Sequence, residues 1–478
     1  MRAGAIDQGT TSTRLMVASE DGNPEISYSI RHKQHRPKPG WVEHDAAELL
    51  ANVQTCAAMA GEVSAIGLAN QGESCMAWNA ETGEPLSPVI VWQDNRTAPA
   101  IQRLRADGHE PLVLARAGLP LDTYFSASKL GWILENIPEA RDAMSSGRLR
   151  MGTTDAYFLD RLTGTFATDV STASRTSLMN LDTLQWDQKL CRIFGVPFEH
   201  LPEIRPTVGP FGELDGVPVT AAIVDKQAAL YGHGCRQNGD TKITFGTGAF
   251  VLSLSGKRIA GACERGLVPT IAWQIGAREP VFAVDGGVYD AGAAIEWIRG
   301  LGLFDDFNEL TGFSAPPAIS RGLAFVPALS GLASPHWDRN AAAVWIGMTA
   351  RTTRIDLCQA TLEGIALQVA EVVTEMSAGF FVSDKLSVDG GLVSSTYFLQ
   401  FLADVTGRTV VTKSSHELTA YGCAALASLG VGGELPELET GSAVYMPRSR
   451  EGEHWRERYA NALSRSLHWR LDEEFSSL

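Results

Sequence analysis

A short stretch near the start of the chain combines glycine, hydroxyl residues and an acid in a way that suits phosphate binding. An apolar run ends at Asp7, hydroxyl residues occupy positions 10–13, and a second apolar run begins at Leu15. Polar residues and glycine between two apolar runs predict a β-hairpin. Backbone N–H groups and hydroxyls at such a turn can surround phosphate oxygens, and Gly9 lets a ligand approach the backbone closely.

The same pattern recurs halfway along the chain. Gly246, Thr247 and Gly248 lie between two apolar runs, which predicts a second hairpin with a glycine-rich turn. One such turn alone is best explained as an ordinary polar loop, but the repetition favours a phosphate-binding role. Asp7, where the first strand ends, is a candidate for holding Mg²⁺ through water.

Three acids follow predicted strands: Asp7, Asp225 and Asp389. Phosphoryl transfer needs donors around the moving phosphate, a metal, and an acid that accepts the proton of the attacking hydroxyl. Asp225 suits that last role, with two facing hairpins gripping a triphosphate. The alternative is that Asp225 caps the helix that follows it, and substitution by Asn separates the two because Asn caps equally well. Asp389 precedes two glycines and fits a turn better than an acid site.

The bulk properties limit the classes of protein. The chain of 478 residues is long enough for two large domains, and the break in the helix after Tyr231 places their boundary between residues 1–234 and 235–478. The formal charge of −15 argues against nucleic acid and anionic membranes as partners. No apolar run is long enough to cross a bilayer, and no signal-peptide core precedes Asp7, so a cytoplasmic location is expected. Seven dispersed cysteines without a CxxC pair suit reduced thiols.

Several well-known site motifs are missing from the sequence. It has no GxxxxGK[ST] phosphate loop, no GxGxxG between a strand and a helix, and no GxSxG nucleophile elbow. Histidines and cysteines do not cluster at metal-ligand spacing. Nucleotide binding through a P-loop or a dinucleotide fold is therefore not expected.

The elements that must position these groups follow from the apolar pattern. Strands are predicted at 64–70, 75–78, 88–92, 218–224 and 386–388, and helices at 46–60, 291–298, 355–376 and 419–427. Polar clusters repeatedly follow the carboxyl ends of the strands, where open α/β sheets bind their ligands. The segments 151–157 and 168–176 are expected to be polar turns, and the chain from Pro447 onward a weakly specified helical tail.

Many segments, in one order along nearly the whole chain, resemble the FGGY carbohydrate kinases, and among them the glycerol kinases. They are Ala5–Ser12, Gly40–Asp45, Ile90–Asp94, Gly118–Leu121, Tyr124–Leu130, Ala173–Thr176, Phe245–Gly248, Ala291–Ile295, Val326–Leu332 and Val388–Gly391. The resemblance implies an α/β fold of two actin-like, ribonuclease-H-like domains that close around ATP, Mg²⁺ and a polyol or sugar. It also implies a kinase acting on an alcohol group, and a homo-oligomer, dimeric or tetrameric, is expected.

The resemblance assigns roles to individual residues. Asp225 aligns with the general base, and Asp7 with the first phosphate loop. The positions that align with the substrate pocket are Gly72, Glu73, Trp92, Tyr124, Asp225, Lys226 and Phe250. Those that align with the nucleotide site are Gln8, Gly9, Thr10, Thr11, Ser12, Arg14, Gly246, Thr247, Gly248, Gly292, Gly390, Gly391 and Ser395.

Two departures from the glycerol kinases lie where the substrate is chosen. Gly72 replaces an arginine of the Gln-Arg-Glu-Thr motif, and Lys226 replaces the first glutamine of Asp-Gln-Gln. Losing the arginine removes a rigid forked donor and leaves space. Either Lys226 substitutes for the arginine and glycerol still fits, or the substrate is a larger or differently oriented polyol, or one with an anionic group. We expect a substrate other than glycerol, because a missing hydrogen-bond partner discriminates strongly. Ser395, where an asparagine is usual, is a milder change.

Two functions of other classes compete with the kinase hypothesis. A non-enzymatic, actin-like ATP-binding protein would share the hairpins but would have no use for a polyol pocket around Glu73, Trp92 and Tyr124. A sugar sensor derived from a kinase would not need both Asp7 and Asp225. These residues favour the kinase.

Overall fold

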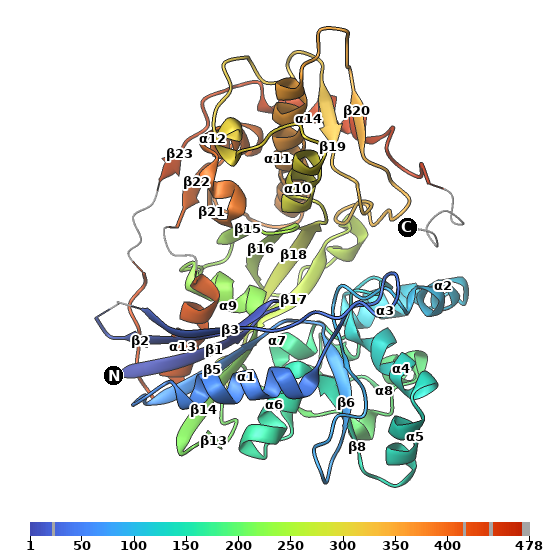
Figure 1. Ribbon diagram of the computed structural model, residues 1–478, viewed down its shortest axis with the longest axis vertical. Helices are drawn as coiled ribbons and strands as arrows, with labels where there is room; N and C mark the ends of the chain where they lie inside the picture. Colours follow the sequence, from blue (N-terminus) through green and yellow to red (C-terminus); the bar gives the residue numbers. More distant parts are fainter. Residues whose placement is uncertain (22–23, 414–416, 439–442, 471–478) are drawn as a thin grey trace.

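The computed structural model describes residues 1–21, 24–413, 417–438 and 443–470, and they form two units, each built on a central sheet (Figure 1). The sheet of the first unit has the strand order β13-β14-β5-β1-β2-β3. Its strands are β1 (Arg2–Gln8), β2 (Ser12–Ser19), β3 (Glu25–Arg31), β5 (Ala65–Asn70), β13 (Glu213–Leu214) and β14 (Val217–Val224).

The sheet of the second unit has the order β17-β18-β16-β15-β21-β22-β23. Its strands are β15 (Thr241–Phe245), β16 (Ala249–Gly256), β17 (Val268–Trp273), β18 (Val281–Val288), β21 (Lys385–Gly390), β22 (Thr409–Thr412) and β23 (Val444–Tyr445). Both predicted hairpins are present, as the antiparallel pairs β1–β2 and β15–β16.

The two sheets repeat one arrangement. In each, an antiparallel meander continues into two parallel strands: β3-β2-β1 into β5 and β14, and β18-β16-β15 into β21 and β22. Parallel strands end at the same edge of a sheet, so the turns after β1, β5 and β14 share one edge, and those after β15 and β21 share another. These edges carry the polar clusters of the sequence.

Helices cover the faces of both sheets. Asp45 caps α1 (Ala46–Ala58) as predicted, because its carboxylate accepts hydrogen bonds from the N–H groups of Ala47 and Glu48. The long helix α11 (Arg354–Gly379) is buried in the second unit. The other α-helices are α2 (Ala98–Ala106), α3 (Glu110–Ala117), α4 (Ser126–Asn136), α5 (Pro138–Ser145), α6 (Thr154–Thr163), α7 (Val170–Ala173), α8 (Gln188–Phe194), α9 (Asp225–Gly232), α10 (Gly292–Gly300), α12 (Thr396–Thr406), α13 (Leu418–Gly430) and α14 (Gly452–Leu463).

Smaller elements complete the fold. A four-stranded sheet has the order β4-β7-β6-β8, with β4 (Glu43–His44), β6 (Cys75–Asn79), β7 (Val89–Ile90) and β8 (Leu149–Thr153). Three two-stranded pairs involve β9 (Ala167–Asp169), β10 (Met179–Asn180), β11 (Gln185–Trp186), β12 (Glu203–Arg205), β19 (Ala324–Val326) and β20 (Val344–Ile346). Short 3₁₀ helices are Phe198–His200, Cys263–Arg265, Phe307–Leu310 and Gly391–Ser394.

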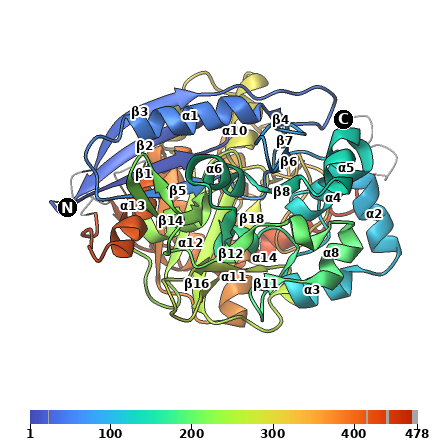
Figure 2. The same cartoon turned by 90° about the horizontal axis from the view of Figure 1, so that it is seen from below.

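Helix α13 of the second half packs against the first sheet, beside β1, β5 and β14, and against α9 (Figure 2). The contact depends on residues without side chains: a Cβ at Gly422 would lie 1.9 Å from the carbonyl oxygen of Ala228, and one at Gly232 would lie 2.0 Å from that of Leu418. The close packing expected for the small-residue helix 419–427 is therefore confirmed. The part of the chain after residue 235 therefore packs against the first sheet as well as forming the second.

Three predicted elements differ from the structure. The segments 151–157 and 168–176 are not polar turns, because β8 runs into α6 in the first and β9 into α7 in the second. Their polar residues are buried and used internally; Asp169, for example, caps α7. The tail after Pro447 is well packed: Trp455 and Tyr459 of α14 are buried, and Trp455 stacks on Phe401. Residues 471–478 of that tail lie outside the described part.

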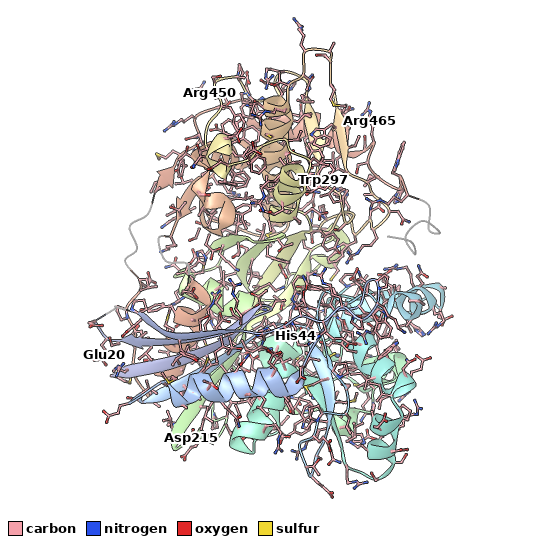
Figure 3. The ribbon with its side chains drawn as sticks, in the orientation of Figure 1. Glu20, His44, Asp215, Trp297, Arg450 and Arg465 are labelled. Carbon is pink, nitrogen blue, oxygen red and sulfur yellow. The ribbon has the colours of Figure 1, made fainter. Side chains whose placement is uncertain are left out.

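One hydrophobic core lies in the second unit and another in the first, and a third cluster joins buried residues of both units. In the second unit Trp297 of α10, labelled in Figure 3, stacks on Trp345 with ring centroids 5.3 Å apart. In the described ranges, no helix has both the length and the apolar character needed to cross a membrane.

Candidate active site

Between the two sheets lies a cavity of about 210 Å³ that both hairpins reach. Thr10 of the first turn and Gly246 of the second line it, and so does Asp225, the first residue of α9. In Figure 1 this helix lies between the two sheets. Two glycine- and threonine-containing turns that are far apart in sequence therefore face one cavity, beside one carboxylate.

All the predicted substrate residues line this cavity. They are Gly72, Glu73, Trp92, Tyr124, Asp225, Lys226 and Phe250. They come from the segments after β5 and β7, the loop before α4, the start of α9, and β16. The fold thus gathers residues spread over nearly 180 positions of sequence into one pocket.

Asp225 lines the cavity and does not cap its helix. The N-cap of α9 is Val224, and Oδ1 of Asp225 accepts a hydrogen bond from the N–H of the next residue, Lys226, at 2.6 Å. Burial raises the pKa of Asp225 to about 6, and the negative charge of Glu73 adds to the effect, while Lys226 opposes it. A carboxylate with a pKa near 6 is largely ionised at neutral pH and is a stronger base than an ordinary aspartate.

Asp7, at the end of β1, has a second perturbed carboxyl group. Burial raises its pKa to about 7, and the negative charge of Asp225 contributes. Its Oδ1 is buried and has no hydrogen-bond partner among the residues that the structure describes. A cation beside Asp7 would relieve both effects. Over the described ranges no group of three or more histidine, cysteine or acidic side chains is arranged to hold a metal ion.

Four buried charges form a network on the substrate side of the cavity. Nε of Arg175 donates to Oε1 of Glu73 at 2.7 Å, and its Nη2 lies 3.2 Å from Oδ2 of Asp285. The ammonium of Lys226 lies 3.1 Å from the same oxygen of Asp285 and 3.5 Å from Oε1 of Glu73. Burial alone would raise the pKa of Asp285, but Lys226 and Arg175 hold it below its ordinary value. The charges of the two cations and the two anions in this network therefore compensate one another.

The ammonium of Lys226 lies beside Glu73, whose neighbour in sequence, Gly72, has no side chain. It donates to the hydroxyl of Tyr124 at 3.0 Å and lies 5.0 Å from the ring centroid of Phe250. Glu73 itself has a left-handed backbone, with φ of 63°. Such a conformation in a non-glycine residue is held by its surroundings, here by Arg175 and by the Ser126 hydroxyl, which donates to the Glu73 carbonyl at 3.0 Å.

The aromatic residues connect the substrate side with the first phosphate turn. Nε1 of Trp92 donates to Oγ1 of Thr10 at 3.1 Å, and its ring meets that of Tyr124 edge to face at 5.7 Å. These rings add apolar surface to the lining of the cavity.

Sequence reasoning missed four residues of this region. Arg175 and Asp285 belong to the charge network, and Lys242 and Asp389 line the cavity beside Asp225. Arg175 was seen only as part of a motif, and Asp389 was interpreted as a turn residue, although it is partly buried on β21 and lies 3.3 Å from Nε2 of His233. Lys242 lies inside a strand, where burial lowers its pKa. An isolated lysine in an apolar strand was the signal available.

The predicted nucleotide residues fall into groups. Thr247 and Gly248 line a second cavity, next to the first. The N–H of Gly292 donates to the carbonyl of Gly246 at 3.0 Å, which joins the start of α10 to the second turn. Gly390 has φ of +97°, and a Cβ there would lie 2.1 Å from the carbonyl oxygen of Phe245. Glycine is required at position 390 because of this positive φ and this close approach to the backbone of Phe245.

Other predicted nucleotide residues do not line either cavity. They are Gln8, Gly9, Thr11, Ser12, Arg14, Gly292, Gly390, Gly391 and Ser395. Arg14 contacts Glu417, across the two halves of the chain, at 3.0 Å. Gln8 is fully buried and donates to the Gly9 carbonyl. Ser395 is also fully buried, donates to the Leu310 carbonyl at 2.6 Å and caps α12. Its hydroxyl is therefore a structural group here, because folding uses both its donor and its acceptor.

Comparison with known proteins agrees with this geometry. Residues 3–232 match the model of the N-terminal domain of the FGGY family of carbohydrate kinases, and residues 241–431 match that of its C-terminal domain. The chain is 41% identical to a glycerol kinase of Thermus brockianus, over 94% of each protein. It is 38% identical to a glycerol kinase of Rhodopirellula baltica, over 99% of this chain and 92% of that protein.

Solved structures show the same fold. The Plasmodium falciparum glycerol kinase with ADP superposes with a TM-score of 0.89 at 31% identity, covering 97% of this chain and 98% of the other. A gluconate kinase from Lactobacillus acidophilus, at 22% identity, gives a TM-score of 0.86 over 98% of this chain and 99% of the other. The second similarity concerns the fold alone.

Proposed function

The chain belongs to the FGGY family of carbohydrate kinases, which phosphorylate a hydroxyl group of a small polyol or sugar with ATP, and we propose that Asp225 is the general base of this reaction. The observation that carries the proposal is the single cavity shared by Asp225 and the two hairpin turns. We further propose that the two domains span residues 1–234 and 235–478.

Each group has a place in the transfer. The carboxylate of Asp225 takes the proton of the substrate hydroxyl. At the same time the oxygen of that hydroxyl forms a bond to the γ-phosphorus, and the bond from this phosphorus to the ADP oxygen breaks. The turns at Thr10 and at Gly246–Gly248 supply N–H and hydroxyl donors to phosphate oxygens. Lys242 brings a positive charge to the same cavity. Glu73, Trp92, Tyr124 and Phe250 orient the substrate.

Mg²⁺ would be held on the Asp7 side of the cavity, through water. The unpartnered Oδ1 of Asp7 and its raised pKa fit a nearby cation. Bound there with the nucleotide, the ion would neutralise charge on the transferring phosphate.

The substrate proposal follows from Gly72 and Lys226. Lys226 brings a positive charge to Glu73, while Gly72, which lines the same cavity, has no side chain to reach a substrate hydroxyl. We propose a polyol or sugar other than glycerol. A true glycerol kinase is the second candidate, favoured by the relatives that carry that name. A non-enzymatic, actin-like ATP-binding protein is disfavoured because the complete set of substrate residues lines the cavity.

An assay of ADP release over three- to six-carbon polyols, ketoses and sugar acids tests the proposal. We expect at least one polyol or sugar to raise the rate of ADP release well above the rate without acceptor. The Asp225→Asn variant should lose this stimulation while still binding ADP. Stimulation that survives in Asp225→Asn would overturn the assignment of the base.

A further inference from the structure

A second cavity, of about 260 Å³, adjoins the first on the far side of the substrate residues. Trp92, Tyr124 and Phe250 line both cavities, so the two cavities meet at these residues. Arg175 and Asp285, which hold the charge network of the first cavity, also line the second. Thr247 and Gly248, assigned above to phosphate oxygens, line this cavity as well, so a molecule that extends from Asp225 toward Arg175, Asp285 and Ser334 shares the cavity with that turn.

The second cavity has the mixed lining that polyhydroxylated chains need. Val268, Trp337 and the shared aromatic rings supply apolar surface. Four lining residues carry buried polar atoms that lack a hydrogen-bond partner in the described structure: Nη1 of Arg175, Oδ1 of Asp285, the hydroxyl oxygen of Tyr289 and Oγ of Ser334. Buried polar groups are nearly always satisfied in proteins, so a cluster of exceptions around one cavity points to a ligand with donors and acceptors.

The charges around the second cavity are compensated, which argues against an anionic ligand. Nη2 of Arg339 lies 3.2 Å from Oδ1 of Asp122, and its guanidinium covers the ring of Tyr289 at 4.0 Å. Asp290 accepts hydrogen bonds from the N–H and hydroxyl of Ser330, at 2.7 and 3.0 Å. Arg175 and Lys226 are balanced by Glu73 and Asp285. An added carboxylate or phosphate would disturb these pairs at a cost in desolvation.

We propose that the substrate is a neutral, unbranched polyol or open-chain sugar of four or more carbons, whose far hydroxyl groups occupy the second cavity. This inference rests on the proposed function, because it places the reacting hydroxyl at Asp225. The remaining carbons pass Tyr124 and Phe250, and the distal hydroxyls reach Arg175, Asp285 and Ser334. Of the substrate types left open by Gly72 and Lys226, it selects the longer chain and rejects the anionic one.

The test compares acceptors of increasing length in the full-length protein. ADP release is measured with glycerol, erythritol and ribitol, and with ribonate as the acid of matched length. We expect kcat/KM to rise at least tenfold from glycerol to the four- or five-carbon polyol, and ribonate to be the poorer five-carbon acceptor.

Two variants narrow the second cavity. Ala333→Leu adds bulk at its wall, and Gly287→Ala adds a methyl group whose nearest neighbours would be ring atoms of Phe250 at 3.7 Å, an ordinary contact. Both should lower the ratio of kcat/KM for ribitol to that for glycerol, Ala333→Leu by tenfold or more. Ala106→Leu, on an exposed position of α2, is the matched control and should leave the ratio unchanged. If Ala333→Leu fails to fold, Gly287→Ala provides the comparison.

The outcomes distinguish a failure of the proposed kinase function from a failure of the inference about the second cavity. If glycerol is the best acceptor and the two variants lower all rates equally, the second cavity is not a substrate site, although the kinase assignment stands. If ribonate is preferred to ribitol, the neutral class is wrong. If no polyol or sugar stimulates ADP release in the wild type, the proposed function fails, and this inference fails with it.

Discussion

The ammonium of Lys226, at the start of α9, lies 3.1 Å from Oδ2 of Asp285, which belongs to β18 of the other unit. Arg175 contacts the same oxygen at 3.2 Å. One carboxylate of the second unit thus holds two cations of the first. Because Lys226 also faces Glu73 and Tyr124, this one side chain joins the two sides of the cleft.

Exchanging the two distinguishing residues should change substrate choice. Gly72→Arg alone adds a third cation beside Arg175 and Lys226, so we expect kcat/KM for glycerol to fall. A Cβ at Gly72 would lie 3.1 Å from Cγ1 of Val224, so that side chain must shift slightly. The double variant Gly72→Arg/Lys226→Gln should have a kcat/KM for glycerol at least tenfold higher than that of Gly72→Arg. A double-mutant cycle measures this coupling, and additive effects would contradict it.

Asp225→Asn should lose activity and gain stability. Loss of the base is expected to lower kcat by about 10²–10⁴-fold. The raised pKa means that the folded state binds this proton more tightly than the unfolded state, so stability falls as pH rises from about 4 to 6 and stays lower above. The neutral amide of the Asp225→Asn variant removes this loss of stability. We therefore expect its free energy of unfolding at pH 7.5 to exceed that of the wild type by about 1–3 kcal/mol. Denaturant titration at pH 7.5 and 4.5 measures it; equal gains at both pH values would contradict the cause.

The rate should depend on the ionisation of Asp225. Only its carboxylate accepts a proton, so log kcat/KM should fall with unit slope below an apparent pKa of about 6 or lower, since bound Mg²⁺ favours the ionised form. A pH series from 4.5 to 8 with excess coupling enzymes measures this. A rate that stays constant down to pH 4.5 would exclude Asp225 as the base.

Asp7 should link Mg²⁺ to stability. With ADP held constant, Mg²⁺ should raise the unfolding temperature of the wild type more than that of Asp7→Asn, because the amide cannot attract the ion as a carboxylate does. Asp215→Asn, at an exposed acid of the first unit (Figure 3), is the control and should respond like the wild type. An identical Mg²⁺ effect in Asp7→Asn would remove Asp7 from the metal site.

The contact of α9 with α13 should be intolerant of a single methyl group. At Gly422 a Cβ would lie 1.9 Å from the carbonyl oxygen of Ala228, so Gly422→Ala must separate the helices, and we expect a loss of about 2–4 kcal/mol. Gly300→Ala, at the end of α10 with no atom within 4 Å of the new Cβ, should be neutral or stabilising. Thermal unfolding compares the two variants. Similar midpoints would show that the interface can adapt.

Local pattern determined much of this protein. Alternating apolar runs and glycine turns specified both hairpins, Asp45 specified the start of α1, and the spacing of small residues specified a closely packed α13, because these features depend on neighbours in sequence. The order of the motifs along the chain identified the family. Asp225 was found because a strand end followed by an acid is visible locally.

Tertiary structure decided the rest, because it depends on groups that meet only after folding. Ser395 had an aligned role and is a buried helix cap. Arg175 was visible only as part of a motif, Lys242 only as a lone lysine in an apolar strand, and Asp285 gave no local signal, yet all three lie in the site or its charge network. The raised pKa of Asp225 and the compensation of Lys226 both come from burial among charges of distant segments. The second cavity, formed by residues between 92 and 339, exists only when the two units meet.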